Sequence, residues 1–392
     1  MTILTGNQQL VKQINKTLVL ETILNEAPIS RADIAQKVGL NKGTVSSLVN
    51  ELIEKQLIYE SGPGKSSGGR RPVMLLFNEK AGYSIGIDLG VNYILGILTD
   101  LKGHIVAEIQ KKLSVTGVEQ VKQMMIAIIE DLIRSAGQSH YGIIGIGIGI
   151  PGMVNNDGEI LLAPNLGWKN VRMKEEIENR FQVPVIIENE ANAGAYGEKL
   201  YGAGKEFDNI LYVSAGIGIG VGVILDGQLF TGSGGFSGEM GHTIIIVNGK
   251  ECSCGSRGCW EQYASEKALL EEAKNIPIPY ADKDSISIEL LVELAKEGNE
   301  EVINLFKKIG AYLGVGINNM INTFNPEQII IGNRLAMAKD WLEESITHFV
   351  KSHTIPFHQQ DLSITFSQLT THSTAVGVCA LSIENFLKTS VK

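Results

Sequence analysis

The sequence lacks any apolar run that approaches the roughly 20 residues of a membrane-spanning helix. Its first residues, MTILTGNQQLVKQINK, contain neither the apolar stretch nor the cleavage site of a secretory signal, so we expect a cytoplasmic protein. Only 20% of the 392 residues are charged and 44% are hydrophobic, which excludes an intrinsically disordered chain. Glycine is abundant, but it shows no collagen period. A chain of this length predicts roughly two to three domains.

Acidic residues exceed basic ones overall, but the excess is unevenly distributed. Residues 1–72 contain nine Lys or Arg and six Asp or Glu, which gives a net charge of +3. The rest of the chain contains 25 basic and 37 acidic residues, a net charge of −12. A basic head on an acidic body indicates a polyanionic partner for the head alone.

Three helical patterns occupy the head. The first runs from Asn7 to Ala27. Ser30, with Asp33 three residues later, is close to a capping box and opens a short helix that ends at Gly39. Asn41 can cap the third helix, in which one apolar stripe consists of Val45, Leu48, Val49, Leu52 and Ile53.

The opposite face of the third helix presents short polar side chains and a lysine: Lys42, Thr44, Ser46, Ser47 and Asn50. Two short helices joined by a glycine-containing turn, with short polar side chains on the second, are typical of a helix-turn-helix in the major groove. Hydroxyls and amides can contact base edges or phosphates there. The alternative is a small helical bundle without a ligand.

A glycine- and serine-rich loop follows the third helix. The segments LIYE and VMLLF are predicted to pair as strands, and SGPGKSSGGRRP between them carries Lys65, Arg70 and Arg71. Such a loop can place cationic groups against phosphates or in a minor groove, as the wing of a winged helix does. A plain flexible linker is the alternative. Together, helices and loop favour a winged helix-turn-helix DNA-binding domain over residues 1–76.

The body, residues 77–392, contains an internal repeat. The segment YSIGIDLGVNYILGILTDLKGHIV recurs as DNILYVSAGIGIGVGVILDGQLF at a constant offset of 126, which pairs Gly90 with Gly216, Gly96 with Gly222 and Asp100 with Asp226. Each copy predicts a strand, a glycine turn and a second strand, so we expect two related lobes that face each other across a ligand cleft. Chance similarity between two glycine-rich hairpins is the alternative.

Three of the four cysteines lie within KECSCGSRGCWEQ. Cys252, Cys254 and Cys259 follow His242, and in a reducing cytoplasm these thiols are not expected to form disulfides. Three thiolates and one imidazole satisfy a tetrahedral zinc ion, although the spacing is not that of a zinc finger. Incidental free cysteines are the alternative. Cys379, within AVGVCALS, is predicted to be a core residue.

The motifs SGEMGH and CSCGSRGCWEQYAS closely resemble the signature of the ROK family of bacterial sugar kinases and sugar-responsive repressors. LAPNLGW, ENEAN and FNPEQIIIG extend the resemblance over essentially the whole body. With a head that ends in GGRRPVML, the chain looks like the repressor branch, and most like the regulators of xylose operons in Gram-positive bacteria. The resemblance implies an α/β, duplicated actin- or hexokinase-like (ribonuclease H-like) body, with a lobe boundary near residues 190–205 and a C-terminal helix that returns to the first lobe.

The resemblance also implies a set of site residues. The zinc ligands would be His242, Cys252, Cys254 and Cys259, and one ring nitrogen of His242 would remain free to donate to a sugar hydroxyl. The sugar pocket would contain Asn189, Glu190, Glu239, His242 and Glu261, with Asn165 and Gly152 nearby. Carboxylates suit this task because each accepts strong hydrogen bonds from two adjacent hydroxyls.

A kinase of this family also needs phosphate-cradling loops and a catalytic aspartate. The first loop here reads DLGVNY, in which Leu89, Val91 and Tyr93 should obstruct a phosphate. Compared with the family's kinases, threonine and glycine in the second loop are replaced by Ala215 and Ile219, and the glycine pair near the adenosine is Gly332 and Asn333. Glu190 occupies the position of the aspartate, which displaces the carboxylate. We therefore expect a sugar sensor without kinase activity.

These features predict a repressor that binds a palindromic operator as a homodimer and is released by xylose, with no membrane partner. An ATP-dependent sugar kinase with a DNA-binding head is the competing class. A repressor that responds to glucose or N-acetylglucosamine is a third possibility, because pocket residues shared across the family do not separate these sugars.

Overall fold

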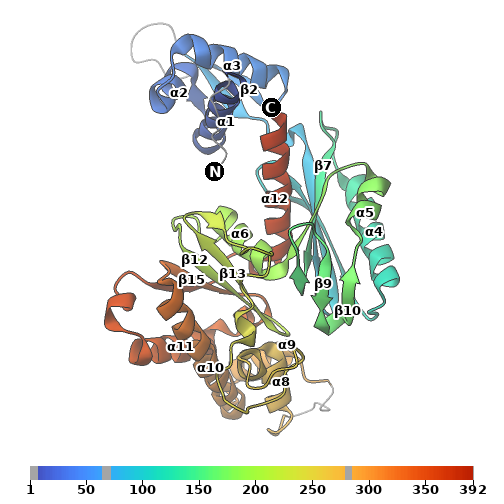
Figure 1. The fold of residues 1–392 in the computed structure, drawn as a ribbon, viewed down its shortest axis with the longest axis vertical. Coiled ribbons are helices and arrows are strands. Elements are labelled where there is room, and N and C mark those ends of the chain that lie inside the picture. The colour runs from blue at the N-terminus through green and yellow to red at the C-terminus, as the bar shows by residue number, and fades with distance from the viewer. Residues whose placement is uncertain (1–7, 64–71, 279–284, 392) are drawn as a thin grey trace.

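The computed structural model describes residues 8–63, 72–278 and 285–391. The chain forms three bodies, a small head and two lobes, with one long helix between them (Figure 1). None of the helices in these ranges combines the length and apolarity that a membrane crossing requires. The predicted fold class, a winged helix-turn-helix followed by a two-lobed α/β body, is confirmed.

The head contains the three predicted helices and a three-stranded sheet. The helices are α1 (Gln8–Glu26), α2 (Arg31–Val38) and α3 (Lys42–Glu54), and the strands are β1 (Ile29–Ser30), β2 (Ile58–Pro63) and β3 (Val73–Phe77) in the order β1-β3-β2. Ser30 and Asp33 form a capping box at α2, and Asn41 caps α3 by accepting from the Thr44 amide. The predicted caps are therefore confirmed.

The head does not have a core of its own. Its buried cluster, built around Val45, Leu52 and Leu75, continues into Leu101 and Ile144 of the body. The same cluster includes buried residues from the end of the C-terminal helix, Ile383 and Val391. Apolar packing therefore fixes the head against the first lobe.

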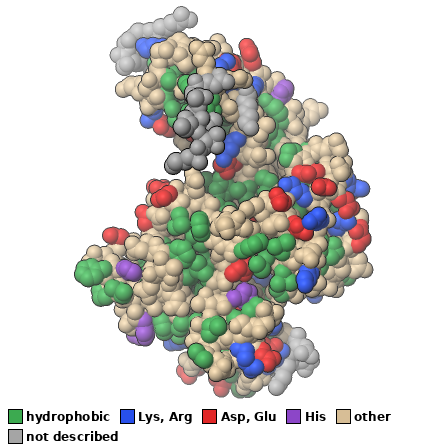
Figure 2. Space-filling view, viewed as in Figure 1, with side chains coloured by type: hydrophobic (Ala, Val, Ile, Leu, Met, Phe, Trp, Pro, Cys, Tyr) green, Lys and Arg blue, Asp and Glu red, His purple; other side chains and the backbone are tan. Residues whose placement is uncertain are grey.

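Lobe 1 is built on a five-stranded sheet in the order β11-β7-β4-β5-β6. The strands are β4 (Tyr83–Leu89), β5 (Tyr93–Asp100), β6 (Ile105–Lys112), β7 (Ile143–Ile150) and β11 (Val185–Asn189), and the helices α4 (Val118–Ser135) and α5 (Lys174–Phe181) follow β6 and precede β11. A small sheet of β8 (Met153–Val154), β9 (Ile160–Ala163) and β10 (Trp168–Val171) extends from it. Figure 2 shows basic and acidic side chains interspersed over α4 and α5, where Lys122 pairs with Glu176 and Arg180 with Glu130.

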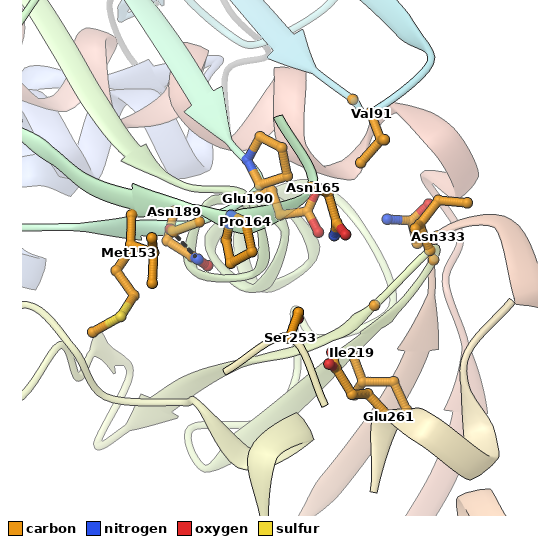
Figure 3. A pocket seen from close by; sticks show the side chains of 18 of the residues that line it. Val91, Met153, Pro164, Asn165, Asn189, Glu190, Ile219, Ser253, Glu261 and Asn333 are labelled. Carbon is orange, nitrogen blue, oxygen red and sulfur yellow. Dashed lines mark hydrogen bonds between the residues drawn. The ribbon is translucent and has the colours of Figure 1, made fainter. Parts of the chain in front are cut away.

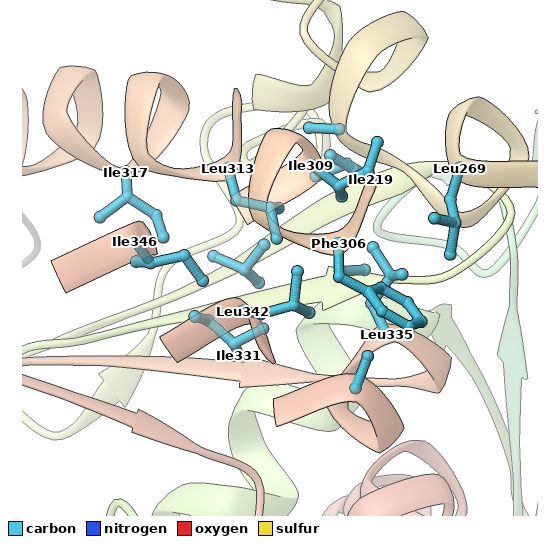
Figure 4. Packing of buried hydrophobic residues seen from close by; sticks show 14 of the residues in the cluster. Ile219, Leu269, Phe306, Ile309, Leu313, Ile317, Ile331, Leu335, Leu342 and Ile346 are labelled. Atoms are coloured by element: carbon cyan, nitrogen blue, oxygen red, sulfur yellow. The ribbon is translucent and has the colours of Figure 1, made fainter. Parts of the chain in front are cut away.

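Lobe 2 repeats this plan with the order β14-β13-β12-β15-β16. Its strands are β12 (Ile210–Ala215), β13 (Ile219–Leu225), β14 (Gln228–Leu229), β15 (Gln328–Gly332) and β16 (Ser363–Phe366). Its helices are α7 (Glu261–Ala264), α8 (Glu266–Ala273), α9 (Ile288–Lys296), α10 (Glu300–Phe324) and α11 (Lys339–His353). Figure 4 shows Phe306, Leu313 and Ile317 of α10 packed with Leu342 and Ile346 of α11 beneath the sheet.

The two sheets confirm the duplication but correct its register. The pairs Leu89↔Ile94 and Ala215↔Ile219 close the two hairpins, so the first turn has four residues between the paired positions and the second has three. The offset of 126 therefore holds only for the first strand of each hairpin. On the second strand Gly96 faces Ile128 of α4, whereas Gly222 faces Ala191 of α6 (Glu190–Tyr201), so these two glycines are not equivalent.

Two helices cross between the lobes. The helix α6 (Glu190–Tyr201) leaves lobe 1 and packs on β12 and β13, whereas α12 (Ser373–Ser390) leaves lobe 2 and packs on β4 and β7. They pack closely because Gly197 and Gly377 approach each other's backbone without side chains. The Glu198 carboxylate, fully buried, accepts hydrogen bonds from Ser367, Ser373 and backbone amides. Hence α6 and α12 are tied into one unit.

Candidate functional site

A cavity of about 300 Å³ lies between the lobes (Figure 3). Its walls come from the residues that follow the carboxyl ends of β4, β7, β11, β12 and β15, where open α/β sheets bind ligands. All seven predicted sugar residues line this one cavity: Gly152, Asn165, Asn189, Glu190, Glu239, His242 and Glu261. The structure therefore brings them together, while their contact with a sugar stays a prediction.

Asn189 is the N-cap residue of α6. Its Oδ1 accepts from the amides of Ala191 and Asn192, and its Nδ2 donates to the Gly152 carbonyl at 2.9 Å. A Cβ at Gly152 would lie 2.4 Å from the Leu162 carbonyl oxygen, so only glycine fits there. These two residues therefore shape the pocket floor, and one N–H of Asn189 is left for a ligand.

Asn165 and Glu239 keep most of their hydrogen-bonding capacity. The exposed side chain of Asn165 has no hydrogen-bond partner among the described residues. The carboxylate of Glu239 lies near the His242 ring, with 3.9 Å between Oε2 and Nε2. Burial raises the pKa of Glu239, and the neighbouring His242 opposes that shift. Unsatisfied amide, carboxylate and imidazole groups that converge on one cavity are suited to a polyhydroxylated ligand.

The four predicted metal ligands form one cluster. One ligand atom from each of His242, Cys252, Cys254 and Cys259 lies within 4.8 Å of all the others. Cys254 Sγ and Cys259 Sγ are 3.7 Å apart, and Cys252 Sγ is 3.5 Å from His242 Nδ1. Tetrahedral zinc with ordinary bond lengths requires about 3.8 Å between two sulfurs and about 3.6 Å between sulfur and nitrogen. The donor set therefore fits zinc, with Nδ1 as the ligand and Nε2 turned toward Glu239.

The two hairpin turns also line the cavity, and this part of it, the turn end, adjoins the metal-ligand cluster because Gly218 of the second turn lies beside Glu261. In the first turn the ring of Tyr93 lies against Gly90, where a Cβ would be only 2.3 Å from the ring. The Tyr93 hydroxyl donates to Asp88 Oδ2 at 2.7 Å. The other oxygen, Asp88 Oδ1, is buried and has no partner among the described residues. Burial raises the pKa of Asp88 to about 7.

The second turn is closed in a similar way. Asn333 Nδ2 donates to Ser214 Oγ at 2.9 Å, and Ser214 Oγ lies 3.5 Å from Glu190 Oε1. Burial, with the nearby Asp88 charge, raises the pKa of Glu190 to about 8. Asn333 adopts φ 63° and ψ −160°, a conformation that is essentially restricted to glycine. A strained asparagine therefore occupies the space at the Gly216 turn.

The structure corrects one part of the predicted obstruction. Val91 and Tyr93 line the cavity, but Leu89 is fully buried in the lobe 1 core. Leu89 cannot obstruct a ligand, because strand alternation points it to the α4 side of the sheet. Ala215 is likewise buried in the lobe 2 core, whereas Ile219 belongs to that core and also borders the cavity.

Sequence reasoning missed several residues of the turn end. Arg334 borders the cavity, but its guanidinium is bound by Glu266 and Glu289. The Asp88–Tyr93 and Ser214–Asn333 bonds were also not predicted. The available signal was a glycine or asparagine directly after each of three strand patterns, at Gly90, Gly216 and Asn333. Pairing between distant turns, however, cannot be predicted from spacing.

On the head, the predicted DNA-facing residues of α3 lie on its outward side. Lys42, Ser47 and Asn50 are exposed, and Thr44 and Ser46 are half-buried. The strands β2 and β3 pair antiparallel as predicted for a wing. The predicted wing residues Lys65, Arg70 and Arg71 lie outside the described residues.

Comparisons with known proteins agree with this architecture. The model of the ROK family matches residues 84–385, and a winged helix-turn-helix DNA-binding model matches residues 14–59. The chain is 46% identical over 384 residues to the xylose repressor of Bacillus spizizenii, covering 97% of this chain and 98% of the relative.

Solved structures give the same result. A ROK family transcriptional regulator, a homolog of the E. coli MLC protein, superposes with a TM-score of 0.83 at 30% identity and covers 97% of this chain and 98% of its own. A ROK family glucokinase from Streptomyces griseus, in complex with glucose and AMPPNP, superposes with a TM-score of 0.70 at 27% identity, covering 76% of this chain and 99% of its own. The glucokinase thus covers a smaller share of this chain than the regulator does.

Proposed function

The chain belongs to the ROK family, and on this premise we propose that it is a sugar-responsive transcriptional repressor that releases its operator when D-xylose fills the interlobe cavity. The observation that carries the proposal is the presence of a winged helix-turn-helix and a polar interlobe cavity in one chain, aligned over nearly full length with a relative named xylose repressor. The division into a DNA-binding domain, residues 1–76, and a sugar-binding domain, residues 77–392, is part of the proposal.

The sugar would bind at the end of the cavity that contains the zinc cluster. Asn165 and Glu239 supply an amide and a carboxylate for hydroxyls, and His242 supplies Nε2. Glu261 supplies its Oε2, because its Oε1 already accepts from Cys252 Sγ and Gln262 Nε2. Asn189 and Gly152 hold the floor, and Glu190 borders the inner end. The relative that is 46% identical to this chain is named for xylose, which is why we propose this sugar.

We propose that His242, Cys252, Cys254 and Cys259 hold a structural zinc ion, on the donor geometry described above. When bound, zinc would fix the orientation of the loop that carries them and stabilise its folded form. The loop also carries Glu239 and Glu261 on either side of the ligands. The residues of the sugar end would therefore depend on the metal for their positions.

We propose that the protein has no kinase activity. The Tyr93 ring lies over the first turn and Asn333 lies against the second, so backbone amides that would cradle phosphates are covered. Arg334, the cation beside the second turn, is bound to two carboxylates. Nucleotide phosphates would need these groups to rearrange before they could bind.

A continuous path of contacts connects the cavity with the recognition helix α3. Asn189 and Glu190 begin α6, which packs along α12. The carboxyl end of α12 contacts Lys55, whose Nζ donates to the Ser390 carbonyl. Lys55 is the C-cap of α3, and Tyr141 donates to its carbonyl at 2.6 Å. Closure of the lobes around a sugar would therefore shift the support of α3.

The proposed operator implies an oligomeric state and a cellular location for the protein. We propose a homodimer that places one α3 helix in each half of a palindromic operator, about 34 to 36 Å apart. A repressor works where its DNA is, so the proposal locates the protein in the cytoplasm.

The testing experiment is a titration of operator DNA with the full chain in the presence and absence of xylose. Xylose should weaken operator binding about 5- to 150-fold. Specific binding that xylose leaves unchanged contradicts the xylose assignment, and glucose and N-acetylglucosamine in the same titration show whether another sugar is the effector. Absence of sequence-specific binding contradicts the repressor.

A coupled assay for ADP formation with xylose and glucose addresses the enzyme alternative. We expect no turnover. Turnover at ordinary enzymatic rates, on the order of 1 per second or faster, would contradict our interpretation of the two turns.

A further inference from the structure

Arg31 contacts the recognition helix from a neighbouring element. It lies in the first turn of α2, and its Nη2 donates to Asn50 Oδ1 of α3 at 3.1 Å. Its Nη1 donates to Glu60 Oε1 of β2 at 2.8 Å. One guanidinium therefore connects α2, α3 and the strand that leads into the wing.

This contact fixes the orientation of the Asn50 amide. A guanidinium has only donors, so the amide atom that faces Arg31 must be the oxygen. The Nδ2 group is then the branch turned away from Arg31, and it has no hydrogen-bond partner within the described ranges. Asn50 consequently presents a donor.

Asn50 occupies the outward face of α3. Gly43, Ser47 and Asn50 follow one another at spacings of four and three residues, which places them on one line of the helix, opposite the buried Leu48 and Leu52. Gly43 has no side chain and Ser47 has a short one, so Asn50 is the longest neutral polar side chain on this line. It is therefore well placed to reach a base edge.

We propose that Arg31 is a positioning residue that sets the base preference of Asn50, and this rests on the proposed DNA-binding function. The usual bidentate contact of asparagine with adenine needs oxygen and nitrogen to face the base together. Because Oδ1 is turned toward Arg31, the base contact of Asn50 is made by Nδ2, which favours an acceptor such as guanine O6 or N7, or thymine O4, over the bidentate pairing with adenine. Glu60 neutralises Arg31, so Arg31 acts through Asn50 and not through phosphates.

The experiment measures equilibrium binding of the full chain to an operator selected by the wild type from randomised duplexes, and to every single base-pair variant of it. The variants are Arg31→Ala, Arg31→Lys, Asn50→Ala and the double variant Arg31→Ala/Asn50→Ala. Asn50→Ala should flatten the preference at one position of each half-site, which identifies the base pair that Asn50 reads. At that position alone, Arg31→Ala and Arg31→Lys should shift the preference toward adenine by about 5- to 100-fold.

The double variant tests whether Arg31 acts through Asn50. Its base ranking should equal that of Asn50→Ala. Two outcomes overturn the proposal: Arg31→Ala weakens all duplexes equally and lowers the salt dependence by about one phosphate contact, or Asn50→Ala changes no preference. A wild type that selects no sequence refutes the proposed function instead, so the two failures are distinguishable.

Discussion

The two ends of the interlobe cavity contain similar residue types but use them differently. At the zinc end, Glu239 has hydrogen-bonding capacity to spare, and Asn165, which lies near Gly218 of the second turn, has no hydrogen-bond partner among the described residues. At the turn end, Tyr93 is bonded to Asp88 and Asn333 to Ser214. One end is prepared for a ligand, whereas the other is closed by its own side chains.

Under the proposed function, the difference explains how a kinase-like fold can keep one ligand and lose another. Both ends follow the same strands, so the sheets that position them are intact. Only side chains on the turns decide whether phosphates can approach, because backbone amides cradle phosphates only when they are uncovered. Loss of nucleotide binding therefore needs no change in the fold.

Loss of the metal should have the largest effect on the difference between the two ends, because it disturbs the residues that we propose bind the sugar. We expect Cys259→Ser to lose zinc and to weaken xylose binding by more than about 100-fold, since ligand loss disorders the loop that carries Glu239 and Glu261. Metal analysis and calorimetric titration measure both effects. Cys379→Ser is the matched control, because this buried cysteine lies outside the cluster. Full xylose affinity in zinc-free protein would contradict the role of the metal.

The buried acids of the turn end predict a pH dependence of stability. The pKa values of Asp88 and Glu190 are raised to about 7 and about 8, so the folded protein holds protons that the unfolded chain releases from about pH 4. The gain in unfolding free energy from these retained protons is complete below about pH 4. It is lost as the pH rises to about 8, at up to about 1.4 kcal/mol per pH unit for each group. Urea unfolding between pH 5.5 and 8.5 measures this slope.

Asp88→Asn/Glu190→Gln should flatten that slope, because amides carry no charge at any of these pH values. Asp157→Asn, an exposed acid of the same lobe, is the control and should leave the slope unchanged. An identical slope in the wild type and the double variant would show that the two acids titrate normally.

Substitution of Glu198, the buried carboxylate at the contact between α6 and α12, tests whether the stability of the two lobes depends on this contact. Glu198→Gln keeps the shape but turns an amide N–H toward the hydroxyl and amide donors that surround this position. We expect a loss of about 1.5 to 3 kcal/mol in unfolding free energy, the usual range for a hydrogen bond to a charged group. Glu384→Gln, which disturbs a less buried carboxylate bonded to Tyr196, is the matched control and should cost less. Equal costs would argue against Glu198 as the main link.

Much of the fold could be predicted from the sequence because its signals are local. The Ser30 capping box, the Asn41 cap and the glycine hairpins each depend on residues within a few positions of one another. The clustering of His242 with the three cysteines could be predicted for the same reason, since the cysteines lie within eight residues. The head core, in contrast, contains Leu101 and Ile383, which no local pattern connects with the head.

The turn end could be predicted only in part. Tyr93 was expected to obstruct the first loop, but its bond to Asp88 depends on one additional residue in the first turn, which a constant sequence offset conceals. The glycine-like conformation of Asn333 is likewise imposed by neighbours distant in sequence. Register and tertiary contacts decide these features, and a single sequence does not display them.

Two substitutions with small expected effects distinguish the residues of the turns from those proposed to bind the sugar. Tyr93→Phe removes the only hydrogen bond to the Asp88 carboxyl among the described residues, and should lower the unfolding free energy by about 1 to 2 kcal/mol at pH 8 while leaving xylose affinity unchanged. Asn165→Ala removes an exposed amide that has no partner in the described part of the chain, so stability should hold while xylose affinity falls about 10-fold. Urea unfolding and calorimetric titration on the same two variants measure this opposite pattern. If Tyr93→Phe weakens xylose binding as much as Asn165→Ala does, the sugar reaches the turns, and the cavity is a single site with no closed end.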